Sequence, residues 1–179
     1  MKYSSRRRTR VLLLADTHGA LDLRIAALAR ECDVAVHAGD IGAAAVLDAL
    51  QAGNAQVFAV RGNNDVPAKW LRAERAALST LEDVAWIELP GGVLIATHGD
   101  QFPPSKRHAR LRSAFPEACA ILYGHSHKLV IDDSELPWVL NPGAAGRART
   151  FGGPSCLLLE ASADAWRVEA HRFERISVR

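Results

Sequence analysis

The sequence predicts an α/β fold in which two packed β-sheets are flanked by helices. In the first third of the chain, short apolar runs alternate with segments whose apolar residues recur at helical spacing, which favours parallel strands joined by helices. In the second half, short apolar runs follow one another across turns, which favours antiparallel pairing. A chain of 179 residues fits one domain, and we expect it to cover residues 10–179 behind a basic lead-in over residues 1–9.

The first five elements follow from this alternation. We expect strands over residues 10–15, 33–38 and 55–60 and helices over residues 20–30 and 43–52. Gly53 and Asn54 end the second helix, because both residues are typical of helix termini. Short apolar strands separated by helices pair in parallel, and the helices cover the sheet.

The second half begins with a β-hairpin, in which Pro90-Gly91-Gly92 joins strands over residues 84–89 and 93–97. A basic amphipathic stretch follows over residues 105–115. Further strands are expected over residues 119–123, 138–140, 155–160 and 166–173. In the last strand, alternation predicts that one face is buried and the other exposed. The inward residues are Trp166, Val168 and Ala170, and the outward residues are Arg167, Glu169 and His171.

Composition argues against several classes of partner. The chain has 22 Lys and Arg against 20 Asp and Glu, so its formal charge is 22 − 20 = +2, too balanced for broad electrostatic binding to nucleic acid or acidic membranes. The longest apolar runs, such as residues 11–15 and 156–159, are too short to cross a bilayer, and no signal-peptide pattern follows the basic N-terminus. Cys32, Cys119 and Cys156 form no C-x-x-C motif, so we expect buried, reduced thiols in a cytoplasmic protein.

Five apolar runs stop at a small group of Asp, His and Asn residues beside a glycine. The groups are Asp16-Thr17-His18-Gly19, Gly39-Asp40, Gly62-Asn63-Asn64-Asp65, His98-Gly99-Asp100 and Gly124-His125-Ser126-His127. In an α/β sheet, the loops at the carboxyl ends of the strands converge on one crevice, where ligands bind. We therefore expect these five groups to meet in space.

Each group also has a structural explanation of its own. Asp16 and Asp40 could cap the helices that follow them, and residues 63–65 could form a turn. His98 could be a hydrogen-bonded loop residue, and the two histidines of residues 125–127 could share a solvent-facing edge. These explanations would have to hold independently at five strand ends, so the joint pattern favours a functional site.

The residue types in these groups favour metal binding. Carboxylate, imidazole and amide groups form a nitrogen and oxygen ligand set without thiolate, which suits Mn, Fe, Zn, Ni or Co. The candidate ligands are Asp16, His18, Asp40, Asn63, His98, His125 and His127. Seven ligands are too many for one ion but suit two ions that share a carboxylate, and such pairs serve phosphoester hydrolysis.

The five groups, in order, resemble the motifs of the calcineurin-like metallophosphoesterase superfamily: D-x-H, G-D, G-N-x-[DE], a single His and G-H-x-H. The matching residues run from Asp16 to His127. The short chain, with Asn141-Pro142-Gly143 after the last motif, is similar to the small YfcE-like phosphodiesterases of bacteria and archaea. The resemblance implies a four-layer α/β/β/α sandwich of two mixed sheets, the metallo-dependent phosphatase fold.

The resemblance also implies a ligand assignment and a reaction. One divalent ion, Mn or another of these transition metals, would bind Asp16, His18, Asp40 and His127. A second would bind Asp40, Asn63, His98 and His125. A hydroxide held between the ions would attack phosphorus in line, because two cations lower the pKa of bound water. The expected activity is that of a dinuclear metal-dependent phosphodiesterase.

The candidate catalytic residues are Asp40, as the bridging ligand, Asn64 and Asp65. Many superfamily members carry a histidine where this chain has Asn64, and an amide cannot act as a general acid. We therefore expect better activity on diesters and activated esters than on alkyl monoesters. Asp65 is expected to hold the Asn63 loop or cap the next helix rather than bind a metal, and Asp100 either orients a ligand imidazole or is a turn residue.

Substrate contacts and partners are less specified by the sequence. The candidate phosphate contacts are Lys69, Arg107, His108, Arg147 and Arg149, although a solvated basic face over residues 105–112 explains some of them. Trp70 could stack on a base but is expected in the core, and His37 and His171 are expected to be structural.

The expected substrate is a small phosphodiester or phosphoester, with no membrane partner and with a homo-oligomer left open. Two alternative functions are a protein-interaction scaffold, because a retromer subunit with the same fold serves mainly to bind partners, and a nuclease. The balanced charge and the lack of interleaved aromatic residues give the nuclease little support.

Overall fold

The computed structural model describes residues 8–53 and 55–175, which form two five-stranded mixed sheets. The order is β10-β9-β1-β2-β3 in the first sheet and β4-β5-β6-β8-β7 in the second. The first sheet contains β1 (Thr9–Leu14), β2 (Val34–His37), β3 (Gln56–Ala59), β9 (Ser155–Ala161) and β10 (Trp166–Arg172). The second contains β4 (Val84–Leu89), β5 (Gly92–Thr97), β6 (Ala120–Tyr123), β7 (Leu129–Asp132) and β8 (Trp138–Pro142). The helices are α1 (Leu23–Ala29), α2 (Ala44–Gln51), α3 (Arg75–Ser79) and α4 (Arg107–Ala114), with 3-10 turns at Arg72–Glu74 and Pro104–Lys106.

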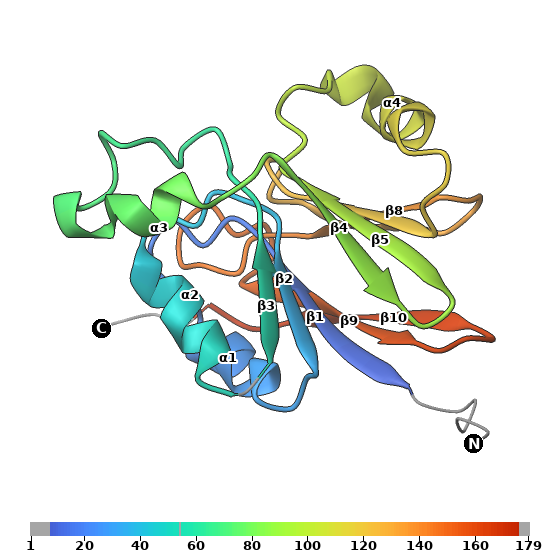
Figure 1. Cartoon of the computed structure of the whole chain (residues 1–179), viewed down its shortest axis with the longest axis horizontal. Helices are drawn as coiled ribbons and strands as arrows, with labels where there is room; N and C mark the ends of the chain where they lie inside the picture. The colour runs from blue at the N-terminus through green and yellow to red at the C-terminus, as the bar shows by residue number, and fades with distance from the viewer. Residues whose placement is uncertain (1–7, 54, 176–179) are drawn as a thin grey trace.

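The molecule has four layers, with the two sheets packed face to face and helices on their outer sides (Figure 1). The inner faces share one apolar cluster, to which β1 contributes Leu13 and the second sheet contributes Leu94 and Leu122. Strand alternation turns Leu12 and Leu14 to the opposite face, where they pack with Ile25 of α1. The α/β/β/α sandwich expected from the resemblance is confirmed.

Strand pairing follows the connections between the strands. The β1–β2 and β2–β3 pairs are parallel, as predicted, because α1 and α2 return the chain to the same edge of the sheet. The second half is not purely antiparallel, which corrects the prediction. The β5–β6 and β6–β8 pairs are parallel, and the first of them is joined through α4, while β4 and β7 are antiparallel edge strands.

Several element boundaries differ from the prediction. α1 begins at Leu23 because Asp22 caps it, accepting a hydrogen bond from the Arg24 amide at 2.9 Å, so neither Asp16 nor Asp40 serves as a helix cap. α3 and β7 were not predicted. β8 extends through Pro142, so the expected Asn141-Pro142-Gly143 turn lies largely within a strand.

The last strand departs from strict alternation at its C-terminal end. Trp166 and Val168 pack on the core between the sheets, as predicted, but Ala170 is exposed and His171 is half-buried. His171 pairs with Cys156, and antiparallel partners share a face, so His171 lies on the side of the sheet that carries α1.

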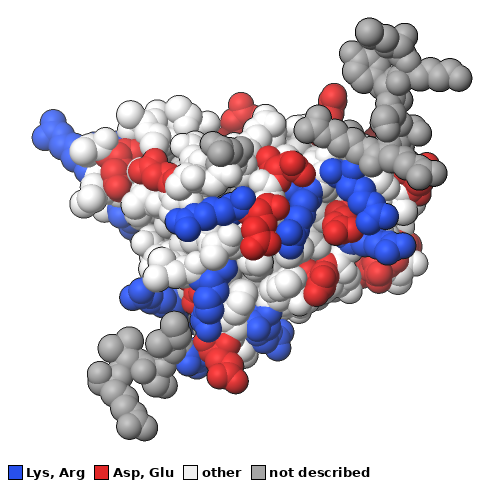
Figure 2. Space-filling model, turned by 90° about the horizontal axis from the view of Figure 1, so that it is seen from below, with Lys and Arg blue, Asp and Glu red and all other residues white. Residues whose placement is uncertain are grey.

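The remaining sequence predictions concern the N-terminus, the cysteines and the membrane. Most of the lead-in lies outside the described residues; Arg8 is exposed and pairs with Glu160 at 3.5 Å, and Thr9 already belongs to β1. All three cysteines are free, and Cys119 is only partly buried. None of the helices in the described part of the chain is long and apolar enough to span a bilayer. On the face shown in Figure 2, basic and acidic side chains alternate without a uniformly basic groove.

Candidate metal centre

The five polar groups predicted from the sequence lie in loops that follow the carboxyl ends of β1, β2, β3, β5 and β6. Backbone hydrogen bonds join the loops of the first sheet, since the amides of Asp16 and His18 donate to the carbonyls of Gly39 and Asp40 at 3.0 and 2.9 Å. The amide of Gly124 donates to the His98 carbonyl at 3.1 Å in the second sheet. The convergence of these loops on one edge of the sandwich confirms the placement argued from the sequence.

The backbone of these loops is unusual. Among the described residues, six that are not glycine have a positive φ between 47° and 65°. They are Asp16, His18, Asp40, His125, His127 and Arg149. L-residues rarely adopt this left-handed conformation, which costs free energy and clusters at functional sites. Five of the six are ligand candidates, so the fold holds the backbone of these residues in a strained conformation that directs their side chains into the site.

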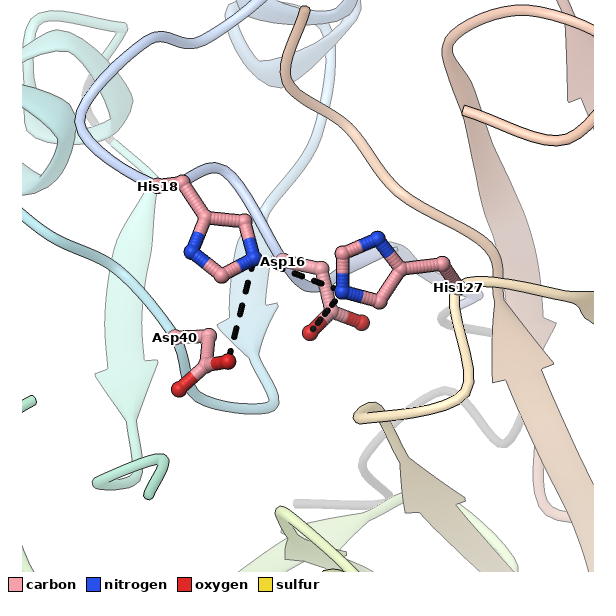
Figure 3. A group of neighbouring side chains, drawn as sticks. All are labelled: Asp16, His18, Asp40 and His127. Atoms are coloured by element: carbon pink, nitrogen blue, oxygen red, sulfur yellow. Dashed lines mark hydrogen bonds and ion pairs between the residues drawn. The ribbon is translucent and has the colours of Figure 1, made fainter. Parts of the chain in front are cut away.

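Four of the candidates form a compact cluster from three loops, with their side chains pointing toward one another (Figure 3). Nε2 of His127 lies 3.3 Å from Oδ1 of Asp16 and 3.3 Å from Nε2 of His18. Nε2 of His18 lies 3.8 Å from Oδ2 of Asp40, and one ligand atom from each residue lies within 4.8 Å of all the others.

This cluster fits a divalent cation. Two imidazole nitrogens and two carboxylates face a common point, which is the donor set of a transition-metal site. Oδ2 of Asp16 is buried yet accepts no hydrogen bond from the described residues. A buried carboxylate with an unused oxygen is costly unless a cation neutralises it.

A second group of candidates lies beside the first and shares Asp40 with it. Oδ1 of Asn63 is 3.1 Å from Nε2 of His98 and 3.1 Å from Nδ1 of His125. Oδ1 of Asp40 lies 3.5 Å from Nε2 of His98, whereas its Oδ2 faces His18. The two oxygens of one carboxylate therefore face two different groups of nitrogen and oxygen atoms.

Hydrogen bonds outside the two groups fix the ligand candidates. Nδ1 of His98 donates to the Ala38 carbonyl at 2.8 Å, which leaves the Nε2 lone pair free toward Asn63 and Asp40. A side chain at Gly39 would approach Nδ1 of His98 to 2.6 Å, so only glycine fits there. His37 is buried and hydrogen-bonds the Thr17 hydroxyl at 2.9 Å, in the structural role expected for it.

The surroundings shift the pKa values of the ligand candidates in both directions. Burial opposes protonation of His98, but contacts with Asp40 raise its pKa above the ordinary value. Burial lowers the pKa of His18 and His125 and lowers that of His127 to about 4, so these imidazoles are neutral with a free lone pair at neutral pH. Burial opposes ionisation of Asp40, but contacts with His98 and Asn64 hold its pKa well below its usual range. Burial raises the pKa of Asp16 to about 7.

Asn64 and Asp65 hold the loop after β3 in different ways. The backbone and side-chain N–H groups of Asn64 donate to the two oxygens of Asp40 at 2.8 and 2.7 Å, and Nζ of Lys69 donates to the side-chain oxygen Oδ1 of Asn64. The buried carboxylate of Asp65 accepts from the amides of Ile41, Gly42 and Gly62 and from Trp70. Asp65 thus ties two ligand loops together, the loop-holding role expected for it.

The other sequence candidates separate into structural and exposed residues. Trp70 is buried in an apolar cluster, as predicted. Arg107 is buried against the Phe102 carbonyl, and His108 is held between Asp132 and Tyr123, so neither faces the cluster. Arg147 is exposed, and NH2 of Arg149 lies 2.9 Å from Nε2 of His18.

A cavity of about 390 Å³ opens beside the second group. Asn63, His98 and Thr97 line it on the metal side, and Arg61, Asp100 and Gln101 are among its other lining residues. Asp100 is exposed in this cavity, and the Ala38 carbonyl rather than Asp100 orients His98. A small phosphorylated molecule fits the size and polarity of the cavity.

A sandwich of this topology with carboxylate, imidazole and amide groups on one edge is the arrangement that the resemblance to metal-dependent phosphoesterases implies. The sequence model of the calcineurin-like phosphoesterase superfamily domain matches residues 10–164. The chain belongs to the calcineurin-like phosphoesterase superfamily, a metal-dependent family, and its Asp16, His18, Asp40 and His127 cluster could hold the metal.

A sequence relative and two solved structures illustrate the similarity. A probable metallophosphoesterase of Methanocaldococcus jannaschii is 32% identical over 114 residues, which are 63% of this chain and 53% of the relative, so the matched part is about half of its length. An archaeal phosphodiesterase structure is 21% identical, covering 90% of this chain and 99% of its own, with a TM-score of 0.68. Vps29 of Entamoeba histolytica, crystallised with Zn²⁺, is 19% identical over 92% of this chain and 98% of its own, with a TM-score of 0.72. At these identities the two structures show a shared fold.

Proposed function

We propose that this chain, as one domain over residues 10–179, is a phosphodiesterase that uses two divalent transition-metal ions. One ion is assigned to Asp16, His18, Asp40 and His127, and the other to Asp40, Asn63, His98 and His125. The observation that carries the proposal is the placement of Asp40, whose Oδ2 faces His18 at 3.8 Å and whose Oδ1 faces His98 at 3.5 Å. A carboxylate shared in this way is the bridging ligand of a two-metal site.

The protein's own groups prepare this chemistry. When bound, two cations supply a hydroxide nucleophile near neutral pH and neutralise the phosphoryl oxygens. Asp40 remains ionised because Asn64 donates two hydrogen bonds to it, and Asn64 is itself held by Lys69. Lys69 and Arg149 lie next to the two groups and are the basic side chains best placed to attract a phosphate.

The nature of the residue at position 64 supports diesters as substrates. Asn64 directs its N–H groups at Asp40 and cannot deliver a proton to a leaving oxygen. Esters whose leaving group is stable as an anion need no such proton. Small aryl diesters should therefore be hydrolysed faster than alkyl monoesters. We also assign the protein to the cytoplasm, and manganese is the first metal to test.

Hydrolysis of a chromogenic bis-aryl phosphodiester tests the proposal. The metal-free protein should be inactive, and Mn²⁺ should restore turnover. Asp40→Asn should lower kcat/KM by at least about 10²-fold, since it removes the charge that both ions share. Arg110→Ala, on an exposed part of α4, is the matched control and should leave turnover unchanged. Turnover that is indifferent to chelation or to Asp40→Asn would exclude the proposed reaction.

A further inference from the structure

Six described residues other than glycine have a left-handed backbone, and five of them are candidate metal ligands. Arg149 is the sixth. Its φ of 52° matches the range of Asp16, His18, Asp40, His125 and His127. Arginine gains no local hydrogen bond that would offset the strain of this conformation. The strained backbone shows that the surrounding structure holds Arg149 in place at a local cost, as it does the five others.

The Arg149 side chain points at a metal-ligand candidate. Its NH2 group lies 2.9 Å from Nε2 of His18, the nitrogen that faces Asp40 and His127. A guanidinium can only donate, so Nε2 of His18 is unprotonated and its single lone pair accepts this hydrogen bond. The same lone pair is the one that His18 would offer to a cation.

The segment before Arg149 is fastened to the loop after β1. The Ala145 amide donates to the Ala15 carbonyl at 2.9 Å, and the Ala145 carbonyl accepts from the backbone amide of Asp22 at 3.0 Å. A side chain at Gly146 would approach the Thr17 carbonyl oxygen to 2.4 Å, so this contact is close. Thr150, directly after Arg149, is buried and its carbonyl accepts from Arg175. These contacts hold the backbone of Arg149 at the site, while the residue itself is exposed.

The charge of Arg149 is uncompensated nearby. In the described part of the chain, Arg149 forms no ion pair with a carboxylate, although the Asp16 carboxylate lies in the cluster that it faces. Burial lowers the pKa of His127, and the Arg149 charge adds to this effect. A positive group beside a cation site weakens cation binding unless an anion is bound as well.

We propose that Arg149 competes with a metal ion for Nε2 of His18 and, when released from His18, binds the phosphoryl group of the substrate. The two states exclude each other because His18 has one lone pair on Nε2. Loss of the hydrogen bond frees a planar guanidinium, which matches phosphate oxygens with two parallel N–H groups. Arg149 thus couples metal binding to substrate binding, and this inference rests on the proposed function.

Metal and phosphate affinities test the coupling separately from activity. Titration calorimetry of the metal-free protein with Mn²⁺ should give a Kd about tenfold lower for Arg149→Ala than for the unmodified chain, because a charge-assisted hydrogen bond no longer competes. In the Mn²⁺-loaded protein, inorganic phosphate should bind about tenfold more weakly to Arg149→Ala. Arg147→Ala, which removes the same charge two residues away on the same loop, should change both constants less than twofold.

The outcomes separate the two proposals. If the unmodified chain binds none of Mn²⁺, Fe²⁺, Zn²⁺, Ni²⁺ and Co²⁺, both the metal-dependent function and the coupling are excluded. If the chain binds Mn²⁺ and hydrolyses the diester but Arg149→Ala and Arg147→Ala have the same Mn²⁺ affinity, the competition is excluded and the function stands. Weaker Mn²⁺ binding by Arg149→Ala, with an unchanged circular dichroism spectrum, would also overturn the competition.

Discussion

Asp16 and Asp40 show how neighbouring buried carboxylates acquire opposite properties. Both side chains are almost fully buried. Asp40 accepts two hydrogen bonds from Asn64 and faces His98, so its pKa stays low despite its burial. Asp16 has one buried oxygen without a hydrogen-bond partner, and burial raises its pKa to about 7. Burial opposes ionisation of both carboxyl groups, and the contacts that the surrounding loops supply to Asp40 outweigh it there.

This difference predicts that Asp16 destabilises the metal-free protein at high pH. The folded-state pKa of about 7 lies above the ordinary value of 3.8, so the folded state binds the proton more tightly. Stability contributed by protonated Asp16 is present below about pH 4 and is lost as the pH rises through 7. In chelator-treated protein, Asp16→Asn should melt at least about 3 °C higher than the unmodified chain at pH 8.

The gap between the two melting temperatures should shrink at pH 4, where Asp16 is protonated in the folded state and near its midpoint in the unfolded state. Thermal melts followed by circular dichroism over pH 4–8 measure the difference. Asp133→Asn, at an exposed position, controls for the general effect of removing a negative charge. A variant that melts below the unmodified chain at pH 8 would show that Asp16 is stabilising as an anion.

The ligand candidates were predicted from residue types, because Asp, His and Asn follow five separate strands and separate structural explanations would have to hold at each of them. The contact between Arg149 and His18 could not be derived in this way, although the sequence offered Arg149 among five candidate phosphate contacts. Its sequence neighbourhood, Arg147-Ala148-Arg149, contains two similar residues, and only the folded chain places one of them on His18. The four donors to Asp65 likewise come from two loops and one indole, which are far from evident in the sequence.

At the scale of single elements, α4 is attached to the second sheet by polar contacts as well as by Leu111. His108 contacts Asp132 of β7 at 2.7 Å and the Tyr123 hydroxyl of β6 at 3.1 Å. Arg112 contacts Asp132 at 3.0 Å and donates to the Pro137 carbonyl at 2.9 Å. The basic stretch predicted from the sequence is therefore an attachment surface on one side and a solvated face on the other.

Loss of Arg112 should destabilise the protein more than loss of a neighbouring basic residue. Arg112→Ala should lower the free energy of unfolding by about 1–3 kcal/mol, because it leaves Asp132 and a carbonyl without their charged donor. Arg110→Ala, exposed on the same helix, should change it by less than about 0.5 kcal/mol. Urea denaturation at pH 7 measures both values.

The Arg112 effect should also depend on pH. Arg112 is the main cause that holds the pKa of Asp132 below its ordinary value, ahead of Ser134 and His108. A depressed pKa contributes stability above about pH 4, and this stability is lost as the pH falls through the folded-state pKa. The difference in the free energy of unfolding between Arg112→Ala and the unmodified chain should therefore become smaller at acidic pH. A constant difference would show that packing alone attaches Arg112.

Elements with strong apolar patterns were predicted, and elements defined by tertiary contacts were not. β1, β2 and the β4–β5 hairpin are buried or tightly paired, so their apolar patterns are clear. β7 is an edge strand whose four residues are all half-buried, and α3 has five residues with one buried side chain. Such short elements exist because of their neighbours, and their own sequences specify them weakly.

At the scale of the whole molecule, the two sheets contribute different ligand candidates to one centre. Asp16, Asp40 and Asn63 follow strands of the first sheet, while His98 and the two histidines of residues 125–127 follow strands of the second. A cation bound by both sets would join the sheets in addition to the apolar contacts between them. Metal binding should therefore stabilise both sheets together.

Hydrogen exchange with and without Mn²⁺ tests this expectation. A ligand present at 100 times its Kd stabilises the folded state by about 2.7 kcal/mol, so amides of β2 and of β6 that exchange by global unfolding should both slow by about 10²-fold. Asp40→Asn should abolish most of the effect in both strands. Protection confined to one sheet would contradict a centre that spans the two.

The position of β1 in the sheet order has a consequence for how the protein is made. β1 lies between β2 and β9, and Leu13 pairs with Leu157, so β1 is synthesised well before β9 and completes its pairing only after β9 has been made. The first 65 residues hold only Asp16, His18, Asp40 and Asn63 of the ligand candidates. A growing chain would therefore hold only a partial set of donors for the proposed centre until residue 127 has been added.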